Sequence, residues 1–363
     1  MRIIIDLDGI ICPLKLPNQS YQELKPNRKV ITLLKRLKRE GHFIIISTSR
    51  HMRTCNDNVE EVVLKIGKIT TDWLRKFDIP YNEIYFGKPH GDIYIDDLAL
   101  PYQSPEDLEK NLKSLMPNFV IPMAGQGKRF LEAGYNIPKY IIKAHKKSMF
   151  EWALASLPLD MAQKVIFICL KEHQKKYNVS KFIRDVVITD YPFLKNRYLI
   201  IWLNKVTRGQ TETVLSAKKY INNEIPLVIY NIDSYFQSSR LRQRLFNVYY
   251  QGIDGVLGVF RSRGHRWSFI KVNKNGFVIK TTEKKPISNL ASTGLYTFTK
   301  GKDFVKAAEY AVKNNLTIKG EFYIAPLYNI LIKERKRFIV DFAEEFWCLG
   351  TPKDLNNFLK KIC

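Results

Sequence analysis

The chain has 363 residues, of which 45% are hydrophobic, and a formal net charge of +24. This length predicts two domains with ample core, and no apolar run is long enough to span a bilayer. Five scattered cysteines without a CxxC pair exclude a disulfide framework and the usual zinc spacings. Acids interrupt the first residues, MRIIIDLD, which is not typical of a secretion signal, so we expect a cytoplasmic protein.

Short predicted strands and helices alternate over the first hundred residues. The strands are predicted at 2–6, 43–46, 83–86 and 92–95, and the helices at 26–40 and within 59–77. Each strand runs into a side chain that can act on a phosphate, since parallel strands end at the same edge of a sheet. In chain order these side chains are Asp6 with Asp8, Ser47 with Thr48, Lys88, and Asp96 with Asp97.

This ordered set resembles the haloacid dehalogenase superfamily of phosphatases, in particular its short, nearly capless members found with capsule-biosynthesis genes. The resemblance implies a Rossmann-like parallel sheet over residues 1–115, with only the loop from Cys12 to Lys25 in place of a cap. It implies that Asp6 is the nucleophile that forms a phosphoaspartate and that Asp8 is the general acid and base. It also assigns phosphoryl binding to Thr48, with Ser47 as the alternative, charge balance to Lys88, and Mg²⁺ binding to Asp6, Asp8, Asp96 and Asp97.

A helix is predicted from Ser104, a suitable N-cap followed by Pro105, to about Met116. Pro117 ends this helix, and we place the domain boundary near residue 115, which makes 116–363 the second domain. No Gly/Ser-rich linker or internal repeat is present.

The second domain opens on the sequence NFVIPMAGQGKR, a predicted strand at 118–122 that runs into a glycine-rich turn. Glycine allows the backbone to approach phosphates closely, and free N–H groups at such a turn bind oxyanions. A lone GxG is usually an ordinary strand–turn–helix connection. Here Arg129 and the pair Pro138-Lys139 follow, and they can neutralise charge as pyrophosphate leaves, which favours a triphosphate site.

Further strands are predicted at 164–170, 185–189, 199–203, 225–230, 255–260 and 267–280, and helices at 148–157, 211–220, from 239, 320–333 and at the C-terminus. The strand at 225–230 ends in NIDS, so Asp233 is either a metal ligand or the N-cap of the next helix. Local pattern alone leaves both alternatives open.

Taken together, the motifs AGQGKR with PK, GQTETVL, NID, EKKPIS with STGLY, GEFY and LGTPKDL resemble the sugar-phosphate nucleotidyltransferases, in the order of that family. The resemblance implies a Rossmann-like mixed sheet with a nucleotide half and a sugar half, and Mg²⁺ as cofactor. The residues it implies are Ala124, Gly125, Gly127 and Arg129 for the triphosphate, Gln210 and Thr211 for the nucleoside, Lys139 for phosphate at the reacting centre, Asp233 for Mg²⁺, and Glu283, Asn289 and Gly294 for the sugar phosphate.

One position departs from that family. Many relatives carry a second metal-binding aspartate just before the final Gly-Thr, where this chain has Cys348, and a thiol suits Mg²⁺ poorly. Either Asp341, Glu344 or Glu345 replaces it, or Asp233 holds the metal with the phosphates alone.

We therefore predict a bifunctional enzyme of surface (capsular) polysaccharide precursor synthesis. Its C-terminal domain would transfer a nucleotidyl group from an NTP, with CTP favoured and GTP next, to a sugar or polyol phosphate. Its N-terminal domain would hydrolyse a phosphate monoester. Two alternatives are a transferase with a catalytically silent N-terminal domain and a basic polyanion-binding protein. The basic residues are spread along the chain without an RNA-binding signature, so we expect no nucleic-acid partner; the oligomeric state is left open.

Overall fold

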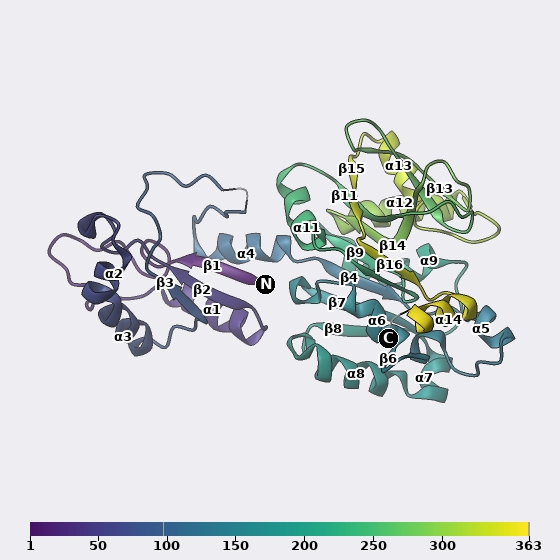
Figure 1. Ribbon diagram of the computed structural model, residues 1–363, viewed down its shortest axis with the longest axis horizontal. Coiled ribbons are helices and arrows are strands. Elements are labelled where there is room, and N and C mark those ends of the chain that lie inside the picture. The colour runs from purple at the N-terminus through teal and green to yellow at the C-terminus, as the bar shows by residue number, and fades with distance from the viewer. Residues whose placement is uncertain (97, 362–363) are drawn as a thin grey trace. The chain divides into compact units, whose positions relative to one another are not determined.

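The computed structural model describes residues 1–96 and 98–361. The chain divides into two compact units, Met1–Leu112 and Lys113–Cys363, and the division falls close to the boundary expected near residue 115. Each unit has its own sheet (Figure 1) and is described by itself. None of the helices in the described part of the chain has the length and apolar character that crossing a membrane requires.

The N-terminal unit is built on a parallel sheet of three strands in the order β1-β2-β3. These are β1 (Arg2–Asp6), β2 (Phe43–Ser47) and β3 (Glu83–Tyr85). β1 and β2 pair in register, with Asp6 opposite Ser47. The isoleucines of β2 are buried, so burial of β-branched side chains favours the strands, and the polar residues collect where the strands end.

The helices of this unit follow the predicted apolar pattern. α1 (Arg28–Arg39) buries Val30, Leu33, Leu34 and Leu37, and the side chain of Asn27 caps its first N–H groups. α2 (Val59–Val62), a π-helical turn (Val63–Gly67) and α3 (Lys68–Lys76) form one continuous helical segment. A short 3-10 turn (Arg53–Cys55) precedes it, and α4 (Pro105–Leu115) leads into the second unit.

The strand predicted at 92–95 is not formed, and the described residues between Tyr85 and Ser104 contain no other strand. Ile93 and Ile95 are 80% and 98% exposed. The Tyr94 hydroxyl donates a hydrogen bond to the Pro89 carbonyl at 2.5 Å, and its ring lies under the Lys88 ammonium at 4.3 Å, so the segment folds on itself instead of pairing with a neighbouring strand.

The C-terminal unit contains a mixed sheet, as predicted, and this sheet has nine strands. Its path runs β13-β12-β14-β9-β4-β7-β8, and β11 pairs with β14 and β15. β9, β4, β7 and β8 are parallel, whereas β14 runs antiparallel to β9. The strands are β4 (Asn118–Pro122), β7 (Lys164–Leu170), β8 (Tyr198–Leu203), β9 (Leu227–Tyr230), β11 (Gly255–Arg261), β12 (Ser268–Val272), β13 (Val278–Glu283), β14 (Leu290–Phe298) and β15 (Phe338–Phe342).

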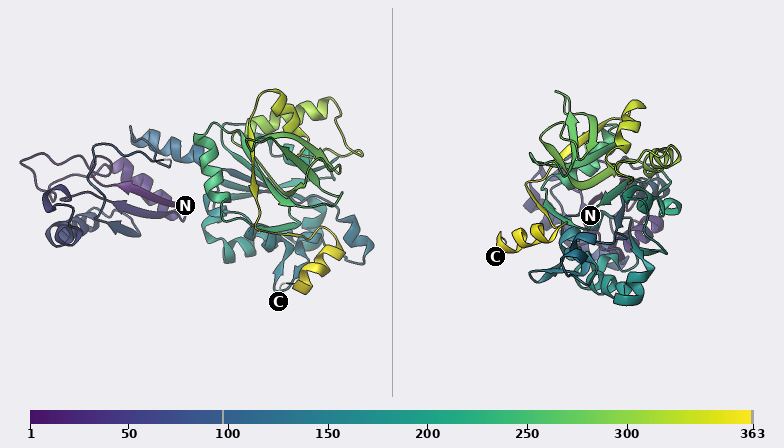
Figure 2. Two further views of the ribbon diagram at one scale, coloured as in Figure 1. Left: turned by 45° about the horizontal axis from the view of Figure 1, so that its top comes forward. Right: turned by 90° about the vertical axis from the view of Figure 1, so that its right-hand side faces the viewer.

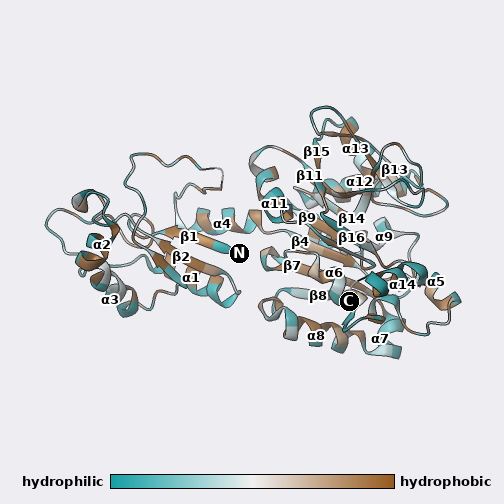
Figure 3. Cartoon of the chain, in the orientation of Figure 1, coloured by the Kyte–Doolittle hydropathy of each residue, from teal (hydrophilic) through white to brown (hydrophobic). Residues whose placement is uncertain are grey.

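Helices cover both faces of this sheet (Figure 2), and the central strands β4 and β7 are mostly apolar after their first residues, Asn118 and Lys164 (Figure 3). Phe119 and Ile121 of β4 belong to one core and Val120 to the other, as the alternation of a strand requires. The helices are α5 (Lys128–Glu132), α6 (Met149–Ala155), α7 (Lys171–Tyr177), α8 (Val179–Asp190), α9 (Gln210–Leu215), α10 (Lys218–Ile221), α11 (Leu241–Tyr250), α12 (Gly301–Lys313), α13 (Leu327–Lys333) and α14 (Pro352–Lys361).

Three predicted elements of this unit were wrong in type or extent. Residues 185–189, predicted as a strand, lie in α8, because Val179, Ile183 and Val187 recur every four residues and bury one helix face. The predicted strand 267–280 is the hairpin of β12 and β13. The helix predicted from residue 320 begins at Leu327 as α13.

A separate two-stranded ribbon completes the unit. β10 (Ser234–Gln237) pairs antiparallel with β16 (Glu345–Cys348), and Ser234 lies opposite Cys348. The Leu349 N–H donates to the Asp233 carbonyl at 2.8 Å. This ribbon brings the end of β9 next to the last motif of the sequence, although the two are more than a hundred residues apart.

Candidate active site

A cavity of about 1140 Å³ opens at the C-terminal ends of β4 and β9 in the second unit. This is larger than the cavities that hold one small ligand, so two substrates can share it. Six Lys and Arg side chains and four carboxylates line it, which leaves a positive excess suited to phosphates. Of the predicted residues, the lining includes Ala124, Gly125, Gly127, Arg129, Lys139, Gln210, Asp233, Glu283 and Gly294.

The glycine-rich turn after β4 forms one wall. Gly127 has a φ of 66°, a left-handed conformation that favours glycine, and a Cβ placed on Gly125 would meet nothing within 4 Å. Gly125 therefore presents bare backbone to the cavity. In the described part of the chain, no hydrogen bond or ion pair holds the Arg129 guanidinium, so its five N–H donors are free for an oxyanion.

Lys139 and Asp233 meet in this cavity. The Lys139 Nζ lies 2.7 Å from Asp233 Oδ2, and both side chains are about a quarter exposed. Lys139 begins a 3-10 turn (Lys139–Ile141), and Asp233 ends the loop between β9 and β10. Mg²⁺ prefers oxygen ligands, so the Asp233 carboxylate would hold this ion in exchange for Lys139. The alternative role of helix N-cap is excluded, because β10 and not a helix follows.

Cys348 lies beside Asp233 but does not replace a metal-binding carboxylate. Burial, together with the charges of Asp233 and Asp354, raises the pKa of its thiol to about 12, so the thiol stays protonated. Its Sγ lies 3.5 Å from Asp354 Oδ2. Asp354 was missed in the sequence reasoning; it lines the cavity and accepts two hydrogen bonds from the Arg266 guanidinium, at 2.7 and 2.9 Å.

The three acids expected as substitutes for Cys348 do not line the cavity. Asp341 is buried on β15 with its Oδ1 3.9 Å from the Arg244 Nε. Glu344 accepts hydrogen bonds from Ser239. Glu345 accepts one from the Trp347 indole at 2.5 Å. The cavity therefore does not support these substitutes: Asp341 lies on β15, and Glu344 and Glu345 are held by Ser239 and Trp347.

Glu283 and Gly294 also line the cavity. Burial raises the pKa of the Glu283 carboxyl, which accepts a hydrogen bond from the Ser268 hydroxyl. Gly294 has a φ of 89°, and a Cβ there would lie 2.7 Å from the Asn231 side chain. Asn231 in turn accepts a hydrogen bond from the Gln210 amide. Close packing of Gly294 against Asn231 thus helps to hold the Gln210 amide in place.

Two further lining residues were missed although they belong to recognised motifs. The Lys284 Nζ donates to the Tyr323 hydroxyl at 2.6 Å, and that hydroxyl donates to Glu321. Lys284, the residue after Glu283, has a φ of 54° and lines the cavity. The signal was the motif EKKPIS itself, in which the basic residue next to Glu283 is a second candidate phosphate ligand.

Residues 119–362 match the model of the family described as nucleotidyl transferase. The chain belongs to the nucleotidyl transferase family. The nucleoside-diphosphate-sugar pyrophosphorylase from Vibrio cholerae RC9 is 32% identical to it, with 67% of this chain and 100% of that one covered and a TM-score of 0.57. A UTP-bound UGPase from Acinetobacter baumannii shares the fold at 16% identity, with 68% and 92% covered and a TM-score of 0.53. No match was found among curated proteins.

Two residues expected to contact substrates in this nucleotidyl transferase domain are turned away from the cavity. Thr211 is fully buried, and its N–H donates to the Phe322 carbonyl; the neighbouring Thr213 lines the cavity in its place. Asn289 is exposed, and its carbonyl accepts a hydrogen bond from the Ser262 N–H. The cavity does not support these two expectations, because a motif identifies a turn, whereas the local backbone decides which of its side chains face the cavity.

The family match begins at residue 119, so it does not test the N-terminal unit. There, Lys88 Nζ lies 2.6 Å from Asp6 Oδ2, and Arg50 binds the Asp8 carboxylate at 2.8 Å. Thr48 is fully buried, and its hydroxyl accepts a hydrogen bond from the Arg50 N–H. Ser47, which is half-buried and opposite Asp6, is thus the hydroxyl nearer the surface.

The magnesium ligand set predicted for this unit is not assembled. Asp96 lies in the irregular segment, is exposed, and accepts a hydrogen bond from the Leu98 N–H at 2.6 Å. Asp97 lies outside the described residues. Among the residues that are described, no group of three His, Cys, Asp or Glu side chains could hold a metal ion. Among the described residues, Asp96 is therefore not brought to Asp6 and Asp8, because the strand that would deliver it is absent.

Proposed function

We propose that the C-terminal unit transfers a nucleotidyl group from an NTP to a sugar or polyol phosphate and releases pyrophosphate. The observation that carries this proposal is the shared cavity, which Arg129, Lys139, Asp233 and Glu283 all line. The family membership and the identity to a nucleoside-diphosphate-sugar pyrophosphorylase support the reaction class.

The chemistry requires two anions to meet. A phosphate monoester oxygen attacks the α-phosphorus, the bond to the bridging oxygen breaks, and pyrophosphate leaves with the electron pair. The bare backbone at Gly125 and Gly127 would bind the triphosphate, and Arg129 would neutralise the leaving pyrophosphate. Asp233 would hold Mg²⁺, which supplies charge neutralisation when bound. Lys139 would turn from Asp233 to the attacking phosphate.

The acceptor would be recognised in the opposite half of the cavity. The Glu283 carboxylate can accept hydrogen bonds from sugar or polyol hydroxyls, and Lys284 can neutralise the acceptor phosphate. For the base we favour CTP, with GTP next, by analogy with the resembling family. The Gln210 amide, which lines the cavity, would contact the nucleoside.

The test is a screen of ATP, CTP, GTP and UTP against hexose, heptose and polyol phosphates, with pyrophosphate and free phosphate measured separately. We expect pyrophosphate release that needs both substrates and Mg²⁺. The variant Arg129→Ala should lose this release, and the matched control Lys146→Ala, an exposed lysine outside the cavity, should keep it. Absence of pyrophosphate with every pair, together with salt-dependent binding to polyanions, would favour the polyanion-binding alternative.

We further propose that the N-terminal unit hydrolyses a phosphate monoester, and that the two units serve surface (capsular) polysaccharide precursor synthesis. The specific observation is the contact of 2.6 Å between Lys88 and Asp6, since a carboxylate attacks phosphorus only when a cation balances the charge. The variant Asp6→Asn should abolish phosphate release and leave nucleotidyl transfer intact. Phosphate release that survives this change would overturn the assignment, and a wild type without it would indicate a silent unit.

A further inference from the structure

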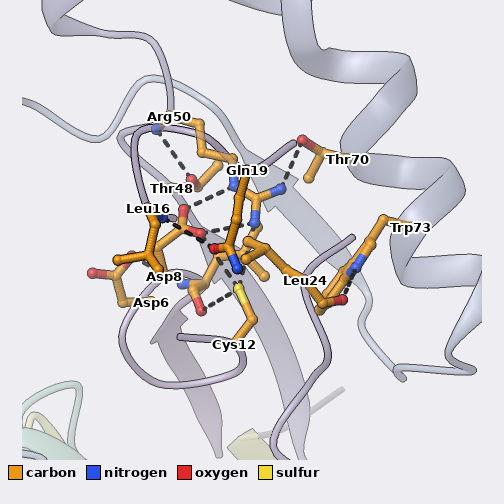
Figure 4. Close-up of polar contacts among 11 residues, drawn as sticks. Asp6, Asp8, Cys12, Leu16, Gln19, Leu24, Thr48, Arg50, Thr70 and Trp73 are labelled. Carbon is orange, nitrogen blue, oxygen red and sulfur yellow. Dashed lines mark hydrogen bonds and ion pairs between the residues drawn. The ribbon is translucent and has the colours of Figure 1, made fainter. Parts of the chain in front are cut away.

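Arg50 holds Asp8 by both carboxylate oxygens (Figure 4). The Arg50 Nε donates to Asp8 Oδ2 and its Nη2 to Asp8 Oδ1, each at 2.8 Å. The Arg50 side chain is fully buried, whereas that of Asp8 is 19% exposed. The guanidinium therefore contacts Asp8 from the protein interior, and the other side of the Asp8 carboxylate stays toward solvent. Two parallel bonds from a planar guanidinium fix the orientation of a carboxylate more strictly than a single bond does.

The guanidinium is itself fixed on its remaining sides. Its Nη1 donates to the Thr70 hydroxyl at 3.3 Å, and its Nη2 lies 3.4 Å from the Cys12 Sγ. The Cys12 thiol also donates to Asp8 Oδ1, at 3.3 Å. The Tyr21 ring covers the guanidinium plane at 4.2 Å. Arg50 thus has little freedom to leave Asp8.

The same arginine ties down the loop that stands in place of a cap. Tyr21 belongs to this loop, residues 12–25, and a second tie follows at Leu24, whose carbonyl accepts a hydrogen bond from the Trp73 indole at 2.8 Å. Through Tyr21 and Cys12, loss of Arg50 would loosen the loop and Asp8 together. Arg50 was not among the residues predicted for the site, because neither its burial nor its partner can be read from its position after Ser49.

We infer that Arg50 is a positioning residue for the phosphatase chemistry of the N-terminal unit, acting by orienting Asp8 toward the bound phosphoryl group. This inference rests on the proposed phosphatase function. Arg50 itself is buried behind Asp8, so it acts through Asp8 and not on the substrate. A change in thermal stability would not distinguish this role from a purely structural one. The positioning role predicts instead that one step of the reaction becomes slower.

That step is hydrolysis of the phosphoaspartate on Asp6. A water oxygen attacks the phosphorus, the bond between phosphorus and the Asp6 oxygen breaks, Asp6 leaves as a carboxylate, and the water proton passes to Asp8. With p-nitrophenyl phosphate, formation of the intermediate releases a phenolate that needs no proton from Asp8. Loss of Arg50 should therefore slow the second step far more than the first, and phosphoenzyme should accumulate.

The experiment uses the full chain with p-nitrophenyl [32P]phosphate and Mg²⁺, rapid mixing and acid quench. Wild type is compared with Arg50→Met, with Arg50→Lys and with the matched control Arg53→Met, an exposed arginine three residues away. We expect Arg50→Met to lower steady-state turnover by about 100-fold, as for a displacement on the order of 1 Å. It should also show a p-nitrophenolate burst and more label on the protein. Arg50→Lys should recover little, because an ammonium cannot form the fork, and Arg53→Met should match wild type.

The outcomes separate this inference from the function on which it rests. Suppose that wild type carries label that depends on Asp6. If Arg50→Met then turns over at the wild-type rate, or carries no more label than wild type, the positioning role alone is overturned. A wild type that neither releases phosphate nor carries label overturns the phosphatase and this inference with it. If melting curves show that Arg50→Met does not fold, Arg50→Lys decides: slower turnover with more label supports the inference, and wild-type kinetics overturn it.

Discussion

The Lys139 ammonium lies 2.7 Å from the Asp233 carboxylate, so a side-chain cation occupies the place that we propose for the metal. The same lysine is proposed to meet the acceptor phosphate. The two tasks conflict until the metal arrives with the nucleotide, because Asp233 can then exchange one cation for another. The ion pair would keep both groups in place while the cavity is empty.

Replacement of Lys139 by Met should separate these two tasks. Without nucleotide, the variant should bind free Mn²⁺ about fivefold more tightly, since it no longer loses an ion pair worth on the order of 1 kcal/mol. Its transfer rate should fall by about 10²–10³, the cost of removing one charge-stabilising donor. Titration of Mn²⁺ by electron paramagnetic resonance measures the binding. Asp233→Asn gives the background of other sites, and an unchanged affinity in Lys139→Met would contradict the competition.

Replacement of Cys348 by Asp should restore a second carboxylate next to Asp233. Without metal, the added charge lies close to both Asp233 and Asp354, so the melting temperature should fall. With Mn²⁺ present, the variant should gain more stability than wild type, because a second oxygen ligand becomes available. Melting curves with and without Mn²⁺ measure both effects, with Cys348→Ser as the matched control. Equal shifts in all three proteins would show that position 348 does not face the metal.

The parts of the site that sequence could predict are those carried by short segments. Gly125, Gly127 and Arg129 lie within one strand–turn–helix, so their spacing nearly determines their geometry. Asp233 follows β9, a strand that was recognised from its apolar residues. Residues whose role depends on a distant partner were missed: Arg266 meets Asp354 across 88 positions, and no local pattern announces such a pair.

The wrong predictions share a physical cause of another kind. Residues 92–95 have the alternation of a strand, but a strand forms only where a neighbouring edge accepts it, and this segment packs on itself through Tyr94. Thr211 and Thr213 look equivalent in the turn GQTETV. The Thr211 N–H donates to the Phe322 carbonyl, and its side chain is buried in the protein and does not line the cavity, which the sequence of the turn alone does not predict.

Replacement by alanine should have different effects at two glycines of the cavity: at one it should lower stability, and at the other it should weaken NTP binding. Gly294→Ala forces a φ of 89° on a residue with a Cβ and places that Cβ 2.7 Å from Asn231, so it should lower the unfolding free energy by about 1–3 kcal/mol. Gly125→Ala meets nothing within 4 Å and should keep the wild-type stability. It should instead raise KM for the NTP, because a methyl group then stands between backbone and phosphate.

Denaturant unfolding and initial-rate kinetics distinguish the two variants. A normal KM in Gly125→Ala would show that the triphosphate does not approach this turn. A normal unfolding curve in Gly294→Ala would show that the Asn231 side chain moves aside at little cost, and the Gln210 contact would then not be held by close packing.

Glu283 should make the stability of the C-terminal unit depend on pH in a predictable direction. Burial raises the pKa of its carboxyl above the ordinary value of 4.5. The folded protein therefore favours the protonated form, and wild type loses this contribution as pH rises from about 4.5 through the raised pKa. Glu283→Gln has no such charge to bury, so its unfolding free energy should gain on that of wild type across this window and then level off.

The Ser268 hydroxyl provides an independent check on this prediction. Its hydrogen bond favours the charged carboxylate and lowers the Glu283 pKa, in opposition to burial. Ser268→Ala should therefore raise the pKa further and extend the window to higher pH. Urea unfolding followed by tryptophan fluorescence at a series of pH values measures the differences between the three proteins. A difference between Glu283→Gln and wild type that shrinks as pH rises would contradict the buried carboxyl, because the sign of the effect depends only on which form the folded state prefers.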